Sequence, residues 1–138
     1  MPIPMEYRLA AKEFDNFLAD VAMKTNLGSR HQAYTTTQGV FFCFRRRLSI
    51  HDAISFVQVL PAMLRALFVS DWNTNELQEK SWDRDLMTDE VKQLRKNHNF
   101  SPDTAINDVA CVLRKYVDEV TFERCLKKLP SHARAFWL

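Results

Sequence analysis

A chain of 138 residues with 46% hydrophobic and 26% charged residues has the composition of a globular domain that is long enough to bury a core. Its formal net charge of +2 is too small to indicate nucleic-acid binding by itself. Only two glycines are present, Gly28 and Gly39, which disfavours an all-β fold and the glycine-rich loops that bind phosphates.

The sequence also bears on where the protein works. No stretch approaches the roughly 18 consecutive apolar residues of a membrane span, and acidic residues lie where a signal peptide carries basic ones. The cysteines are odd in number and form no C-x-x-C pair, which favours reduced thiols in a helical core: Cys43, Cys111 and Cys125. We therefore expect a cytoplasmic protein without a membrane span.

Two long amphipathic helices are predicted first. Apolar residues such as Phe17 and Val21 recur at helical spacing, so we expect a helix over residues 9–25, with Gly28 as its left-handed C-cap. Ser29, followed three residues later by a glutamine, is a capping-box pattern that starts a second helix. Both helices carry an apolar face wide enough to pack against a core.

Two shorter helices follow, separated by a proline. Ser49 has the position and chemistry of an N-cap and starts a third helix. Pro61 has no amide hydrogen and disfavours helical geometry at the residue before it. It should therefore end the third helix and start a short fourth one that ends near Phe68. A polar connector is expected over residues 71–86, with Trp72 folded back on the core.

The second half of the chain follows the same order. Ser101 before a proline is a start signal for a helix, and Asp118 occupies the capping position that corresponds to Ser49. Pro130 should break the chain as Pro61 does, leaving a short apolar helix at the end. No run alternates in the manner of a strand, so the sequence predicts an all-α fold.

Part of the middle of the chain recurs at its end. Residues 60–66 read LPAMLRA and residues 129–135 read LPSHARA, 69 positions later. The register also holds upstream, where Arg45 falls on Arg114. Self-similarity of this kind indicates one helical unit used twice. We expect a single compact all-α domain over residues 1–138, made of two tandem, related units of three to four helices, at 9–70 and 87–138, joined by the polar connector 71–86.

A set of patterned positions covers nearly the whole chain from Phe14 onward. They are Phe17 and Val21 on the first helix, Arg45 and Leu48 at the end of the second, the tag Leu60-Pro61 with Arg65, Trp72 in the connector, and the second tag Leu129-Pro130 with Arg134. This pattern resembles a bacterial family catalogued as domain of unknown function 2267. The resemblance implies a helical fold of two repeats and supplies no activity.

The repeated arginines Arg65 and Arg134 are the most specific pair of candidate site residues. Each lies four residues after a helix-breaking proline, where its side chain can donate to the carbonyls freed by the break or to a carboxylate of the other unit. Because a requirement of the fold would recur at equivalent positions, we favour a structural role over a phosphate or acidic-ligand site.

A run of three arginines lies at the end of the second predicted helix: Arg45, Arg46 and Arg47. Cations there complement the negative end of the helix dipole, and three adjacent residues span too much of a turn to face one partner. We therefore favour a solvated face. The alternative is a basic patch for nucleic acid or anionic lipid, with Lys127 and Lys128 as further contacts to nucleic acid.

No pattern of catalytic or metal-binding residues is present. The four histidines have no H-E-x-x-H or His–Cys spacing, and no Ser–His–Asp arrangement occurs. We assign no catalytic, cofactor or metal residues, and enzymatic activity is not indicated.

These features favour a non-enzymatic module that interacts with another protein, with a homo-oligomer as one form of that interaction. Aromatic residues are enriched where partners dock, so the candidate contacts are Phe42, Phe68, Trp72 and Trp137. The competing function is a regulator that binds nucleic acid through the arginine run. A weaker third alternative is a small-ligand pocket between the two units.

Overall fold

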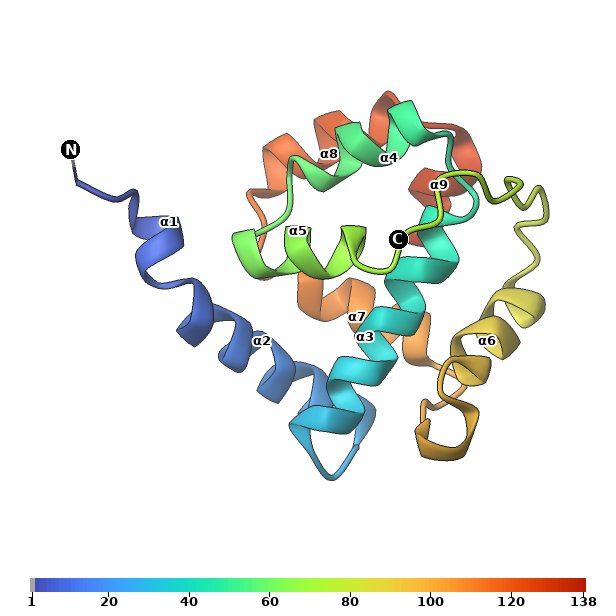
Figure 1. Cartoon of the computed structure of the whole chain (residues 1–138), viewed down its shortest axis with the longest axis horizontal. Coiled ribbons are helices and arrows are strands. Elements are labelled where there is room, and N and C mark those ends of the chain that lie inside the picture. Colours follow the sequence, from blue (N-terminus) through green and yellow to red (C-terminus); the bar gives the residue numbers. More distant parts are fainter. Residues whose placement is uncertain (1) are drawn as a thin grey trace.

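The computed structural model describes residues 2–138, and every regular element in that part of the chain is helical (Figure 1). No helix within it is long and apolar enough to cross a membrane. The elements are α1 (Met5–Arg8), α2 (Ala10–Thr25), α3 (Arg30–Arg45), α4 (Ile50–Val57), α5 (Ala62–Val69), α6 (Arg84–Gln93), the 3₁₀ turn η1 (Lys96–His98), α7 (Ala105–Leu113), α8 (Glu119–Lys127) and α9 (Ser131–Phe136). The all-α prediction is confirmed.

Helix α3 lies at the centre of the fold. It packs against α2, α5, α6 and α7, while α4 lies beside α8 on one side of the molecule (Figure 1). Val40, Phe41 and Phe44 in α3 have no exposed surface. Helix α1 contacts little besides α2, and the N-terminal end of the chain extends away from the body.

Aromatic rings from distant parts of the chain fill the core. Phe44 in α3 lies 4.8 Å from the ring of Phe56 in α4 and 4.8 Å from that of Phe136 in α9, centre to centre. Trp137 stacks on Phe56 at 5.4 Å with an interplanar angle of 18°. The last turn of the chain is therefore part of the core, and it ties α9 to α3 and α4.

Four helix starts lie where the sequence places them. The hydroxyl of Ser49 accepts the Asp52 N–H at 3.1 Å at the start of α4, and the carboxylate of Asp118 accepts the Thr121 N–H at 3.0 Å at the start of α8. Pro61 and Pro130 are the N-cap residues of α5 and α9. These four predictions are confirmed.

Two predicted helix boundaries are wrong. The left-handed C-cap of α2 is Asn26, with φ of 58°, and not Gly28; asparagine tolerates this conformation because its short polar side chain bonds locally. Helix α7 begins at Ala105, a turn later than the Ser101 signal indicates. The Ser101 hydroxyl is instead paired with that of Thr36 at 2.7 Å in the interior.

The aligned arginines Arg45 and Arg114 make related contacts. Arg45 donates from Nη1 to the carbonyl oxygens of Phe68 and Ser70, both at 2.8 Å. Arg114 donates from Nε to the carbonyl oxygen of Trp137 at 3.0 Å. Phe68 and Trp137 are themselves 69 positions apart, which is the spacing of the sequence repeat. Each arginine thus holds the C-terminal end of the short helix that follows a proline.

Candidate docking cleft

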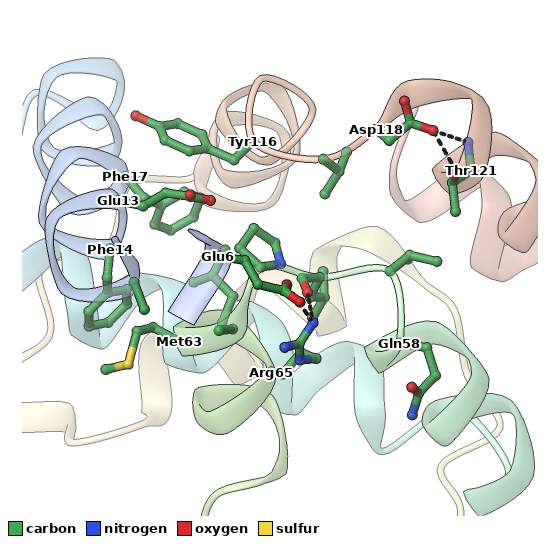
Figure 2. Close-up of a pocket in the computed structure, with 17 residues that line it drawn as sticks. Glu6, Glu13, Phe14, Phe17, Gln58, Met63, Arg65, Tyr116, Asp118 and Thr121 are labelled. Atoms are coloured by element: carbon green, nitrogen blue, oxygen red, sulfur yellow. Dashed lines mark hydrogen bonds and ion pairs between the residues drawn. The ribbon is translucent and has the colours of Figure 1, made fainter. Parts of the chain in front are cut away.

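A cleft lies where α1 and α2 face two turns of the chain, one between α4 and α5 and the other between α7 and α8 (Figure 2). Its volume is about 290 Å³, close to the lower limit of roughly 300 Å³ for small-molecule pockets. Its lining comes from three segments far apart in sequence, within residues 6–17, 58–65 and 116–121.

Two helix starts shape the cleft. Pro61 keeps Leu60 out of helical geometry, so the chain turns between α4 and α5. Asp118 caps α8 and accepts hydrogen bonds from both the N–H and the hydroxyl of Thr121, which fixes the second turn. These turns face α2, and the cleft lies between them and the helix (Figure 2).

The floor of the cleft is apolar. Phe17, Leu60 and Leu64 line it and expose 1%, 2% and 2% of their surface, so they also belong to the core. Phe14 and Met63 lie closer to solvent at one end of the cleft, and Met63 exposes 38% of its surface. The floor is already buried by the fold, so the apolar surface that a partner would cover is at the end of the cleft, beside Phe14 and Met63.

The rim of the cleft is acidic. Its charged residues are Glu6, Glu13 and Asp118 against the single cation Arg65. Arg65 lies 3.5 Å from the Glu6 carboxylate and donates to the carbonyl oxygen of Leu60 at 3.0 Å, so its charge is already used. Among residues 2–138, neither Glu13 nor Asp118 has a cationic side chain at ion-pair distance. The rim therefore offers the Glu13 carboxylate to a ligand, and beside it Asp118, whose carboxylate also caps α8.

Tyr116 closes one side of the cleft as a neutral group. Its hydroxyl donates a hydrogen bond to the carboxylate of Asp20, and its ring packs edge-on against Phe17 at 5.4 Å. Burial raises the pKa of Tyr116 to about 12, with further contributions from the hydrogen bond and charge of Asp20 and the charge of Glu13. The hydroxyl therefore remains protonated at neutral pH and ties Asp20 of α2 to the chain that follows α7.

Residues 14–136 match the family described as uncharacterized conserved protein (DUF2267). The chain belongs to this family. The match begins at Phe14 in the cleft, so α1 and the first turn of α2 lie before the matched range. The family description carries no activity, and a search of curated proteins finds no match to the chain.

The prediction that Phe68 and Trp137 offer exposed contact surface is wrong. Both side chains are fully buried, because the ends of α5 and α9 point into the aromatic core. Phe42 and Trp72 are half-buried, and they lie on the guanidinium of Arg45 at 4.1 and 5.2 Å from its central carbon. Trp72 folds back on the core as the sequence predicts.

The arginine run is not a solvated face. Arg45 and Arg47 expose only 5% and 3% of their surface, and Arg46 forms ion pairs with Glu76 and Glu90. The reason lies in the tertiary structure. The chain after α5 wraps over the end of α3, and carbonyl and carboxylate oxygens of that later chain contact the guanidinium groups. The other two nucleic-acid candidates, Lys127 and Lys128, are exposed at the end of α8.

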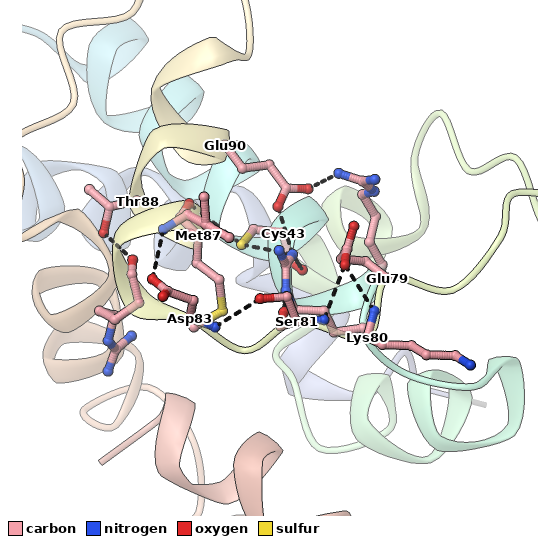
Figure 3. Close-up of polar contacts among 12 residues, drawn as sticks. Cys43, Glu79, Lys80, Ser81, Asp83, Met87, Thr88 and Glu90 are labelled. Atoms are coloured by element: carbon pink, nitrogen blue, oxygen red, sulfur yellow. Dashed lines mark hydrogen bonds and ion pairs between the residues drawn. The ribbon is translucent and has the colours of Figure 1, made fainter.

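Arg47, just after α3, bonds to the wrapped segment at Ser81 and to α6 at Glu90. Figure 3 shows the polar contacts around Ser81, Cys43 and Glu90. Its Nη1 donates to the carboxylate of Glu90 at 2.6 Å and to the carbonyl oxygen of Cys43 at 2.9 Å, and its Nε donates to the carbonyl oxygen of Ser81 at 2.5 Å. Burial raises the pKa of the Cys43 thiol to about 12, so the thiol is a core group and not a nucleophile. These contacts bind the connector to α3.

The repeated arginines Arg65 and Arg134 differ in their surroundings. Arg65 lies at the cleft, whereas Arg134 lies 3.6 Å from the carboxylate of Glu123 in α8. The remaining cleft residues are not among the sequence candidates. Glu6 and Glu13 belong to no motif, and Tyr116 follows the end of α7 without one, so only the turns at Pro61 and Asp118 mark the cleft in the sequence.

Proposed function

We propose that this protein is a non-enzymatic interaction module, and that the cleft is the place where a segment of another polypeptide docks. The observation that carries the proposal is the combination of an apolar floor with carboxylates at the rim that have no cationic partner among the described residues. A segment with apolar side chains and one lysine or arginine complements both features.

A peptide titration tests this proposal. A fluorescently labelled peptide of alternating leucine and arginine should bind, while the matched leucine–glutamate peptide should not. Glu13→Arg should weaken binding of the cationic peptide by about fivefold or more, because it replaces attraction with repulsion at the rim. Asp89→Lys makes the same kind of charge change on an exposed residue of α6 and serves as the control.

Equal binding to the wild type and to Glu13→Arg would remove the cleft from the proposal. Equal binding of the two peptides would remove the charge argument. Failure of both peptides to bind to the monomeric chain would count against the cleft as a docking site for polypeptides.

A small-ligand site is the second candidate, because the cleft is lined by the N-terminal and C-terminal halves of the chain alike. Its chemistry would suit a small apolar amine. Native mass spectrometry of the freshly purified protein tests it: a retained small cation supports this function, and a bare polypeptide mass counts against it.

We place this activity in the cytoplasm of a bacterium. The described cysteines support the location, since Cys43, Cys111 and Cys125 are all free thiols. Fractionation of the native cell tests the assignment, and recovery in an oxidising compartment would contradict it.

A further inference from the structure

The N-terminal arm, defined here as residues 2–9, leaves about half or more of each of its large apolar side chains exposed. Ile3, Met5, Tyr7 and Leu9 expose 63%, 61%, 53% and 48% of their surface. Helix α1 within the arm buries no residue, and a helix of four residues has little stability of its own. This is the densest group of exposed large apolar residues along the sequence, and it lies beside the docking cleft.

The charges of the arm complement those of the cleft. Arg8 of the arm is exposed and has no ion-pair partner among residues 2–138, while Glu13 and Asp118 at the rim have none either. Glu6 of the arm already faces Arg65 of its own chain. The arm therefore presents apolar side chains and the cation Arg8, which is the chemistry that the cleft accepts.

The arm is also positioned for exchange. The Glu6–Arg65 pair and the position of the Arg65 guanidinium 5.8 Å from the Tyr7 ring hold the arm at the mouth of its own cleft. Two copies related by a two-fold axis through this face would each bring an arm to the other's cleft, so the contact would be closed and self-complementary.

We infer that the occupant of the cleft is the N-terminal arm of a second copy of this chain, which makes the protein a reciprocal dimer. The inference rests on the proposed function and names its partner. Apolar side chains of the partner's arm pack at the mouth of the cleft beside Phe14 and Met63, and its Arg8 pairs with the rim carboxylate Glu13. The contact occurs twice in each dimer.

Two charge-reversal variants test the dimer. Arg8→Glu and Glu13→Arg should each raise the dissociation constant of the dimer by about tenfold or more, because two attractive contacts per dimer become repulsive. Lys24→Glu makes a similar change on an exposed residue at the far end of α2 and should leave the dimer unchanged. Circular dichroism confirms that each variant is folded.

The mixture of the two variants is the decisive sample. When Arg8→Glu and Glu13→Arg chains are combined, one contact joins the two substituted side chains, whose charges are exchanged but still opposite, and the other contact is the wild-type pair. A heterodimer should therefore form. Analytical ultracentrifugation of the separate variants and of their mixture measures this directly. A mixture that remains monomeric, a wild-type chain that is monomeric throughout a concentration series, or an Arg8→Glu chain that dimerises as well as the wild type would each overturn the inference.

The peptide titration separates this inference from the proposed function. If the wild-type chain is monomeric but binds the leucine–arginine peptide through Glu13, the cleft is a docking site for another protein and the second copy is excluded. If the chain is monomeric and the peptide also fails to bind, the proposed function falls as well.

Discussion

Arg45 donates from Nη1 to the carbonyl oxygen of Phe68 at 2.8 Å, across 23 residues of sequence, and so joins the end of α3 to the end of α5. The side chain exposes only 5% of its surface, and its guanidinium lies on the rings of Phe42 and Trp72. A charged group in this position stabilises the fold only because carbonyl oxygens and π faces replace its water.

Removing this side chain should be costly. Arg45→Ala leaves the carbonyl oxygens of Phe68 and Ser70 without their donor, and we expect the free energy of unfolding to fall by about 2–4 kcal/mol. Arg46→Ala, at a half-buried position with ion pairs near the surface, should cost about 1 kcal/mol or less. Urea denaturation of both variants measures the difference, and equal losses would show that the position of Arg45 is not special.

The two glycines should respond differently to alanine. A Cβ atom on Gly39 would lie 3.0 Å from the carbonyl oxygen and 3.1 Å from Cγ1 of Val91, so α3 and α6 would have to separate. We expect Gly39→Ala to destabilise the fold by about 1–3 kcal/mol. Gly28 has no close neighbour and no positive φ, so Gly28→Ala should be neutral or slightly stabilising. Thermal unfolding of the pair tests the packing of α3 on α6.

Because of Tyr116, the free energy of unfolding should depend on pH in the alkaline range. Its pKa is raised from 10.0 to about 12 by burial and by Asp20 and Glu13, so above pH 10 the unfolded chain releases a proton that the folded chain keeps. The free energy of unfolding should therefore fall as pH rises from about 10 to 12. Tyr116→Phe should show a smaller fall over the same range. Denaturant unfolding at a series of pH values compares them, and identical slopes would contradict the assigned shift.

Trp137 should act through the core and not through a partner. Its ring is fully buried and packs on Phe44, Phe56 and Phe136. Trp137→Ala should lower the free energy of unfolding by about 3–5 kcal/mol. Trp72→Ala, at a half-buried position, should cost less. Chemical denaturation ranks the two variants. A larger loss of unfolding free energy in Trp72→Ala than in Trp137→Ala would contradict the central place of Trp137 in the core.

Local chemistry was enough to predict much of the scaffold. Ser49 and Asp118 act as N-caps and Pro61 starts a helix because each effect involves only neighbouring backbone groups. The same local reasoning chose the wrong C-cap for α2. Asn26 and Gly28 both tolerate the left-handed region, so local chemistry did not decide between them.

The surroundings of the charged residues could not be predicted in this way. Arg45 and Arg47 look solvated in sequence, and they are buried because chain segments 23 to 43 residues away bring acceptors to them. The cleft was hidden for the same reason. Glu13 and Tyr116 become neighbours only when α2 packs on α7, and neither residue belongs to a motif.

The most direct measurement of the central claim is an amide chemical-shift map of the chain during titration with the leucine–arginine peptide. The account predicts shifts that begin at Phe14, Leu64 and Val117 around the cleft, with none at Lys127 and Lys128 on α8. In a sample dilute enough to be monomeric, shifts confined to the exposed lysines of α8, or no shifts at all, would contradict docking in the cleft.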